Sequence, residues 1–356
     1  MVSTFVRRSH PKPEKGGTSL LNENAARLKQ RLQGMGLSNP AIEAAWPTWW
    51  SDDADASASA KAELRFSLSR KLGLDPHSLL DDAQVPRFVW RDIARFKHLK
   101  GETEIERAGI TSFGVALGSV LASAIASWRP LEGMSAREMR DALIGGRPFI
   151  ELADLLAIAW SVGIPIVHLR VFPWPQKRMA AMAVQIGRRS VILLGRDSEY
   201  PPQIAFYIAH ELAHLALGHV EAGNVIVDLD ASDLAAAETD PEENAADRYA
   251  LEVLTGQDSP VVLSGTGRGG ARSLADAVLG ASVELGIEPG TLALCFGYST
   301  KKWAVANAAM RYIYAAPKPV WQEVNDVARE QLDFDRIPHD SRAYLAAVLG
   351  TRGFGE

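Results

Sequence analysis

Residues 204–219 read IAFYIAHELAHLALGH, and this stretch decides how the middle of the chain folds. Its apolar residues recur at intervals of three and four, which predicts a helix that we expect to run from Gln203 to about Leu217. Three polar side chains, those of His210, Glu211 and His214, interrupt the apolar run. Burying them costs free energy unless each has a partner, so we expect the three to act together.

The two histidines lie four residues apart, a spacing typical of a zinc site. At about 100° per residue, their side chains fall within about 40° of each other and one helical turn apart. Two imidazole nitrogens in this arrangement can bind one zinc ion. Glu211 projects toward the open side of that metal, where it can take a proton from bound water. The alternative is a pair of buried histidines that hydrogen-bond within the core.

A catalytic zinc needs a third protein ligand and an open position for water. His219 is near, but nine helical steps after His210 it would lie on the opposite helix face, so we expect it only to suit the helix C-terminus with its charge. The segment DPEENAADRYALEVL, residues 240–254, offers Glu243 followed one turn later by Asp247. A carboxylate in that second position can orient a zinc-bound histidine through its other ring nitrogen.

Glu243 has both competitors and an alternative role. Glu242 and Glu238 are neighbouring carboxylates, and Asp240 with Glu243 also fits a capping box at the start of a helix. Adjacent helical positions diverge by about 100°, and only Glu243 has a carboxylate four residues later. Spacing therefore favours Glu243 as the third zinc ligand, with the capping role left open.

These motifs together resemble the ImmA/IrrE-type zinc metallopeptidases. The similar features are a strand-like SVILLG, a helix with HELAH and, after an acidic loop, a helix with Glu-x-x-x-Asp-x-aromatic-Ala, all within roughly residues 151–254. The resemblance implies a gluzincin-like core, in which a small sheet packs against helices. It also implies that zinc is held by His210, His214 and Glu243.

The same resemblance implies that Glu211 is the general base, and it places Asp247 where the family often has asparagine. The chain departs from the family at residues 252–255, which read Glu-Val-Leu-Thr in place of Leu-Leu-Met-Pro. The resemblance does not extend to the flanking helical segments, so the choice of substrate can differ. Members of the family typically cut helix-turn-helix repressors, which implies a selective cut in a repressor or antitoxin.

The composition limits the class of protein. The chain has 356 residues, 47% of them hydrophobic, which indicates about two domains with ordinary cores. A balance of 38 Lys and Arg against 43 Asp and Glu gives −5, which excludes the basic excess of a dedicated nucleic-acid coat. Cys295 is the only cysteine, so neither an intramolecular disulfide nor a paired-cysteine zinc site can form.

The N-terminal sequence has no apolar signal core, and the uncharged stretch Ile110–Trp128 is rich in Ala, Ser and Gly. Such low apolarity favours a buried helix over a membrane span. We therefore expect a soluble cytoplasmic protein without membrane contact.

The fold class we expect is α+β and mostly helical, with one strand-rich region. Runs at residues 179–186 and 190–195, joined by a Gly-Arg-Arg turn, predict a hairpin in a small antiparallel sheet, to whose edge an extended peptide could add. Ser51–Ala60 is expected as a linker and Phe88–His98 as a helix. The predicted division is a mobile segment at 1–20, an N-terminal helical domain at 21–145, a zinc core at 151–256 and a C-terminal helical domain at 271–350.

Two segments share an unusual frame. LGLDPHSL at 72–79 and LGIEPGTL at 285–292 each place a glycine where one helix ends and an acid and a proline where the next begins. Each predicts a helix-turn-helix corner. Most such corners only pack helices, but DNA-reading units use them too. Basic residues follow the second corner, namely Lys301, Lys302, Arg311 and Lys318.

The function we expect is zinc-dependent hydrolysis of a peptide bond at a selected site in a protein substrate. The alternative is a transcription regulator whose corners bind DNA and whose zinc is structural or sensory. The peptidase and regulator hypotheses differ in the role of Glu211, because a regulator with structural zinc has no need of a base beside the metal.

Overall fold

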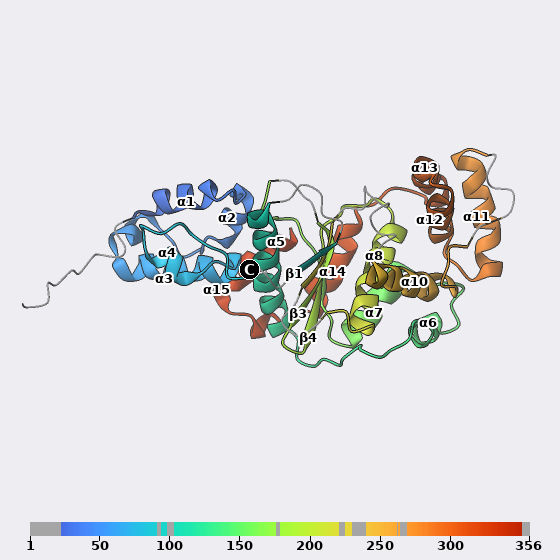
Figure 1. Cartoon of the computed structure of the whole chain (residues 1–356), viewed down its shortest axis with the longest axis horizontal. Coiled ribbons are helices and arrows are strands. Elements are labelled where there is room, and N and C mark those ends of the chain that lie inside the picture. The colour runs from blue at the N-terminus through green and yellow to red at the C-terminus, as the bar shows by residue number, and fades with distance from the viewer. Residues whose placement is uncertain are drawn as a thin grey trace, which may run out of the picture.

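The computed structural model describes residues 23–90, 94–97, 103–175, 179–220, 225–229, 240–261, 263 and 269–350. The predicted mobile segment at 1–20 lies outside these residues. The molecule is elongated, with a helical group at each end and a sheet between them (Figure 1). The α+β class is confirmed.

Among the described residues, four α-helices form one end of the molecule, and three form the other. The first group is α1 (Ala25–Gly34), α2 (Asn39–Ala45), α3 (Ala58–Leu72) and α4 (Pro76–Leu80). The second group is α11 (Ala271–Leu285), α12 (Pro289–Thr300) and α13 (Trp303–Ile313). The central helices are α5 (Glu104–Ser123), α6 (Ala136–Ile144), α7 (Leu152–Ser161), α8 (Pro201–Ala216), α10 (Pro241–Thr255), α14 (Val320–Gln331) and α15 (His339–Leu349).

In the part of the chain that the structure describes, the sheet has five strands in the order β1-β5-β3-β4-β2. The strands are β1 (Ala94–Lys97), β2 (Ile166–His168), β3 (Met179–Ile186), β4 (Arg189–Leu194) and β5 (Val225–Leu229). The predicted hairpin is present as β3 and β4, which pair antiparallel up to Ile186 and Arg189. Gly187 begins its two-residue turn with φ +62°, a conformation that favours glycine.

The sheet is mixed, so the antiparallel sheet predicted from the sequence is wrong in this respect. β2 runs parallel to β4 and β1 runs parallel to β5, while β3 is antiparallel to both of its neighbours. Parallel pairing needs a long crossover connection, which a local hairpin signal does not reveal. Both hairpin strands are interior, so the edges of the described sheet, to which a peptide could add, are β1 and β2.

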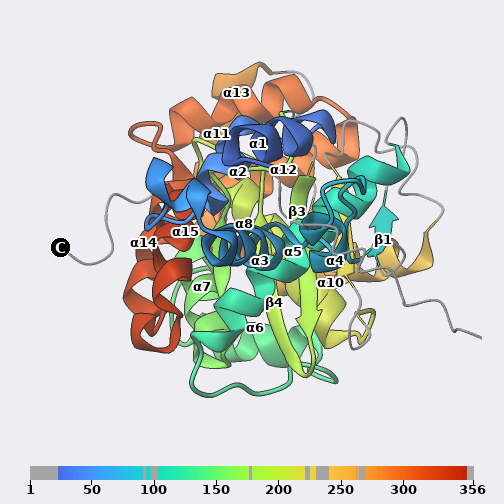
Figure 2. The same cartoon turned by 90° about the vertical axis from the view of Figure 1, so that its left-hand side faces the viewer.

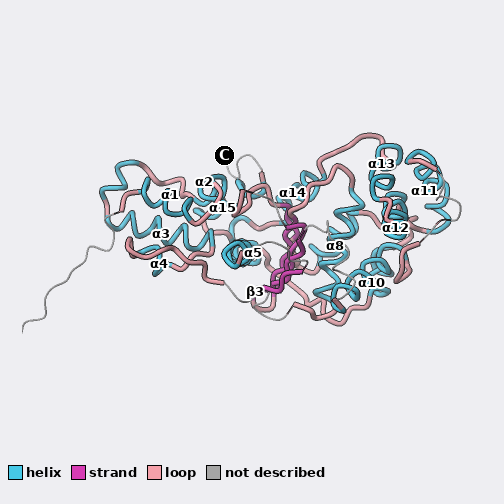
Figure 3. Tube along the Cα trace, turned by 45° about the horizontal axis from the view of Figure 1, so that its top comes forward, coloured by secondary structure: helices cyan, strands magenta, loops and turns pink. Residues whose placement is uncertain are grey.

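The sheet lies between α5 on one face and α8 on the other (Figure 3). Side chains of β3 alternate accordingly: Met182 and Val184 belong to the core under α5, while Ala181 and Ala183 belong to the core under α8. Small side chains on the second face let α8, which carries the histidines, approach the sheet closely.

The uncharged stretch forms most of α5, a helix buried against the sheet. Among the described residues, α5 alone is by itself long and apolar enough to span a membrane, and 72% of its apolar window is buried. A Cβ at Gly109 would lie 2.1 Å from the Trp174 ring, and one at Gly114 would lie 2.3 Å from Met182 Sδ. These glycines permit close packing, which is consistent with a core helix of a soluble protein.

The core under α5 contains residues from helices that lie early and late in the sequence. It contains Leu64 and Leu68 of α3 together with Leu345 and Leu349 of α15, and Tyr344 donates a hydrogen bond to the carbonyl of Lys71 at 2.8 Å. Figure 2 shows α15 beside α2 at this end of the molecule. Helices from the first and last parts of the chain therefore share one core, across the domain boundaries drawn from the sequence.

Two local predictions are corrected. Ser51–Ala60 is not a linker, because Asp52–Ala56 is a 3-10 helix and Ser57 caps α3 by accepting from Ala60 N–H. The composition of this segment is typical of a linker, but Ser57 stabilises the start of α3 by capping it. The predicted helix at Phe88–His98 contains the strand β1, because tertiary pairing with β5 outweighs helical periodicity there.

At each predicted corner one helix ends at a glycine and another helix begins. Gly73 and Gly286 have φ +68° and +65°, and the carboxylates of Asp75 and Glu288 cap the helices that follow. α4 has only 5 residues, and α11 and α12 meet at 115°. Most of α12 is buried, from Gly290 through Gly297 except for Leu294.

Candidate metal centre

The helix α8 carries the polar trio as the sequence predicts. Pro201 and Pro202 begin the helix, where their missing N–H groups are not needed, and it ends at Ala216. Ile208 and Leu212 are fully buried, and the three polar residues are buried as well, His210 at 6% exposure and both Glu211 and His214 at 0%.

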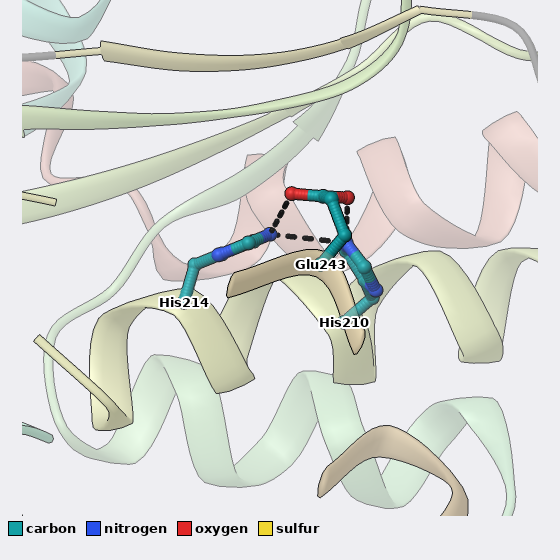
Figure 4. A group of neighbouring side chains, drawn as sticks. All are labelled: His210, His214 and Glu243. Carbon is teal, nitrogen blue, oxygen red and sulfur yellow. Dashed lines mark hydrogen bonds and ion pairs between the residues drawn. The ribbon is translucent and has the colours of Figure 1, made fainter. Parts of the chain in front are cut away.

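The two histidines and Glu243 of α10 meet with their ligand atoms at one point (Figure 4). Nε2 of His210 lies 3.0 Å from Nε2 of His214. The Glu243 carboxylate spans the pair, with Oε2 3.3 Å from His210 Nε2 and Oε1 3.3 Å from His214 Nε2. Within the part of the chain that the structure describes, no other group of three such side chains brings its ligand atoms this close.

These separations fit a metal ion. Ligand atoms about 2.0–2.1 Å from a tetrahedral zinc lie about 3.3 Å from one another. The two ring nitrogens here are 3.0 Å apart, and each lies 3.3 Å from one oxygen of the carboxylate. Both ring nitrogens and the carboxylate are donors that divalent metals accept. The cluster of His210, His214 and Glu243 could therefore hold a metal ion.

The outward nitrogens of both histidines also have partners. Nδ1 of His210 lies 2.9 Å from Oδ1 of Asp247, and Nδ1 of His214 lies 2.9 Å from Nδ1 of His219. A proton on each Nδ1 leaves the lone pair of each Nε2 directed at the shared point. This is the tautomer that a metal ligand needs.

In the metal-free protein, the surroundings of Glu243 favour its ionised form. Burial raises the pKa of its carboxyl group, but hydrogen bonds and charge from His210 and His214 outweigh burial and hold that pKa well below its ordinary value. Glu243 is therefore ionised at neutral pH, as a carboxylate ligand must be.

The competing carboxylates are placed differently. Asp240 caps α10 by accepting from the N–H of Glu242 at 2.9 Å, and the side chain of Glu242 is only half-buried. Glu243 is 3% exposed and faces the histidines, so it is the candidate ligand that the geometry supports. Glu238 lies outside the described residues.

Glu211 lies beside His210 on α8, fully buried, and is not one of the three residues whose ligand atoms converge.

The predicted position of His219, on the helix face opposite His210, is wrong. Counting helical steps puts it opposite His210, but α8 ends at Ala216 and Gly218 turns the chain with φ +71°. The turn brings the His219 ring back to His214. Gly218 was the available signal, since a glycine just past a helix typically marks its end.

Searches against protein-family models, curated proteins and solved structures found no match to the chain.

Proposed function

We propose that this protein is a zinc-dependent metalloendopeptidase that makes a selective cut in a protein substrate. The observation that carries the proposal is the convergence of His210 Nε2, His214 Nε2 and the Glu243 carboxylate in a buried cluster, with Glu211 next to the first histidine. The ImmA/IrrE-type resemblance of the motifs supports the same activity.

Zinc is the metal we propose for this donor set. Two imidazoles and one carboxylate are a known set for catalytic zinc and leave a fourth position open for water. The same donors also suit non-haem iron, which uses further open positions. A buried carboxylic residue beside the ligands favours hydrolysis, because hydrolysis needs a base next to the metal.

The chain's own residues have separate roles in this mechanism. His210, His214 and Glu243 hold the metal, which when bound polarises the scissile carbonyl and makes water acidic, with a pKa near about 7. Glu211 accepts the proton of the attacking water and returns it to the leaving nitrogen. Asp247 keeps His210 in the ligating tautomer.

For the substrate we propose a helix-turn-helix repressor or an antitoxin, cut in a linker or an exposed loop. This part of the proposal depends on the family resemblance.

No observation favours the alternative of a DNA-binding regulator with structural zinc. In a DNA-reading unit the second helix of the corner lies in the groove with its side chains accessible. Here α12 is largely buried, and α4 has 5 residues.

The deciding experiment combines metal analysis with Glu211→Gln. Purified wild-type protein should contain one zinc ion per chain and cut a co-encoded repressor at one site while leaving unfolded casein largely intact. Glu211→Gln should keep the zinc and the fold and lose about two to four orders of magnitude in cleavage rate. Glu242→Gln, a change in a half-buried carboxylate near the site, is the matched control and should cut normally. Stoichiometric iron, or full activity of Glu211→Gln, would show the proposal to be wrong.

A further inference from the structure

The end of α8 forms a specific hydrogen-bonded motif. Leu217 is the C-cap, Gly218 follows with φ +71°, and the N–H of His219 donates to the carbonyl of His214 at 2.9 Å. This is the six-to-one bond of the Schellman motif, which places the second residue past the cap over the residue five positions earlier. The backbone alone therefore brings residue 219 to residue 214.

The side chains of the same two residues are also in contact. Their Nδ1 atoms are 2.9 Å apart and their ring centroids 5.2 Å apart, and the rings are inclined at 59°. Schellman motifs commonly carry an apolar contact at this place. Here the contact is between two imidazoles, and one of them is a candidate metal ligand.

We propose that His219 is a positioning residue of the metal centre, a role that rests on the metal binding proposed above. With the metal on Nε2 of His214, the proton of that ring is on Nδ1. His219 then accepts this hydrogen bond on its own Nδ1 and carries its proton on Nε2. The bond holds the His214 ring in the orientation and tautomer required for ligation.

The Nδ1 atoms of the two ligand histidines thus contact different kinds of side chain. His210 faces the carboxylate of Asp247, and His214 faces the neutral ring of His219. A charged acceptor makes a stronger hydrogen bond than a neutral one. Loss of His219 should therefore weaken metal binding by about tenfold, at the lower end of the range for such partners.

A purely structural role for His219 can be separated from this one. The backbone bond from His219 N–H does not need the imidazole, and leucine would supply the apolar contact that such motifs usually have. His219→Leu should therefore leave the metal-free protein folded, with its Tm lowered only by the loss of one side-chain hydrogen bond to His214. His219→Asn places an amide oxygen near the position of Nδ1 and should restore the acceptor.

The test uses the full-length chain and measures zinc affinity by chelator competition, together with thermal unfolding of the metal-free protein. We expect His219→Leu to bind zinc about tenfold more weakly while its metal-free form still unfolds cooperatively, and His219→Asn to recover most of the affinity. In zinc-loaded wild-type protein, ¹⁵N NMR should show His214 protonated on Nδ1 and His219 on Nε2.

Three results would overturn the inference while leaving the proposed function intact. They are wild-type zinc affinity in His219→Leu, an equal loss in His219→Asn, and a second zinc ion per chain that needs His219, which would make it a ligand. Failure of wild-type protein to bind zinc would instead contradict the proposed function, and this inference with it.

Discussion

The carboxylate of Asp247 lies 2.9 Å from Nδ1 of His210, one helical turn after Glu243, whose own carboxylate lies 3.3 Å from Nε2 of the same ring. One imidazole is thus held between two carboxylates of α10, one at each nitrogen. The helix fixes both contacts at once, because residues four apart project from the same face.

This relationship predicts the effect of changing Asp247. Asp247→Ala should weaken zinc binding by about 10–100-fold, because the His210 ring loses the acceptor that sets its tautomer. Asp247→Asn keeps an oxygen acceptor and should lose less. Chelator competition measures both changes, and Asp258→Ala, at an exposed acid just past α10, is the control. Equal zinc affinity in Asp247→Ala, Asp247→Asn and Asp258→Ala would show that Asp247 does not contribute to metal binding.

The third ligand can be tested by comparing two adjacent carboxylates. Glu243→Ala should lose stoichiometric zinc, since Glu243 spans both histidines, while Glu242→Ala should retain it. Metal content after gel filtration is the measurement. Circular dichroism of both variants shows whether α10 is intact. Equal zinc retention would return Glu243 to the capping role considered from the sequence.

A buried histidine away from the metal predicts a pH dependence of stability. Burial lowers the pKa of His168, although the Arg196 carbonyl and the Asp197 charge favour the protonated form. The unfolded chain therefore takes up a proton more readily than the folded chain. The stability linked to His168 is fully present above its ordinary pKa of about 6.5 and is lost as the pH falls toward the lower folded value.

The measurement is urea unfolding at about pH 7.5 and about pH 5.5. Wild-type protein should lose more free energy of unfolding between the two values than His168→Gln, whose side chain does not titrate but can still donate to the Arg196 carbonyl. The same pH dependence in both proteins would show that His168 does not contribute.

Asn325 of α14 is predicted to be important for stability. It is 1% exposed, and its side chain pairs with the backbone of His168 in both directions, accepting from N–H at 2.7 Å and donating to the carbonyl at 2.8 Å. It also donates to the carbonyl of Leu349 at 2.8 Å. The amide therefore covers part of the β2 edge and ties it to α15.

Asn325→Ala should lower the free energy of unfolding by about 2–4 kcal/mol, because buried backbone groups lose their partners. Asp326→Ala, which removes an exposed ion pair to Arg329 on the same helix, should change it by less than about 1 kcal/mol. Urea unfolding of both variants is the check. A loss below about 1 kcal/mol for Asn325→Ala would mean that water replaces these bonds.

The elements that sequence reasoning located are those defined by nearby residues. The spacing of His210 and His214, the prolines at the start of α8 and the turn at Gly187 act over a few residues, and so do the glycine and acid at each corner. Glu243 could be favoured over Glu242 for the same reason, because direction on a helix repeats about every 3.6 residues.

Only the tertiary structure decided which distant segments meet. The parallel partners β1 and β2, the packing of α15 on α3 and the bond between Asn325 and His168 depend on burial shared by segments far apart in the chain. The hydrophobic periodicity of one segment does not indicate which distant segment it packs against. The position of His219 depends on both local sequence and structure. Counting about 100° per residue assumes that the helix continues to His219, but the chain turns at Gly218, and this turn brings the ring to His214.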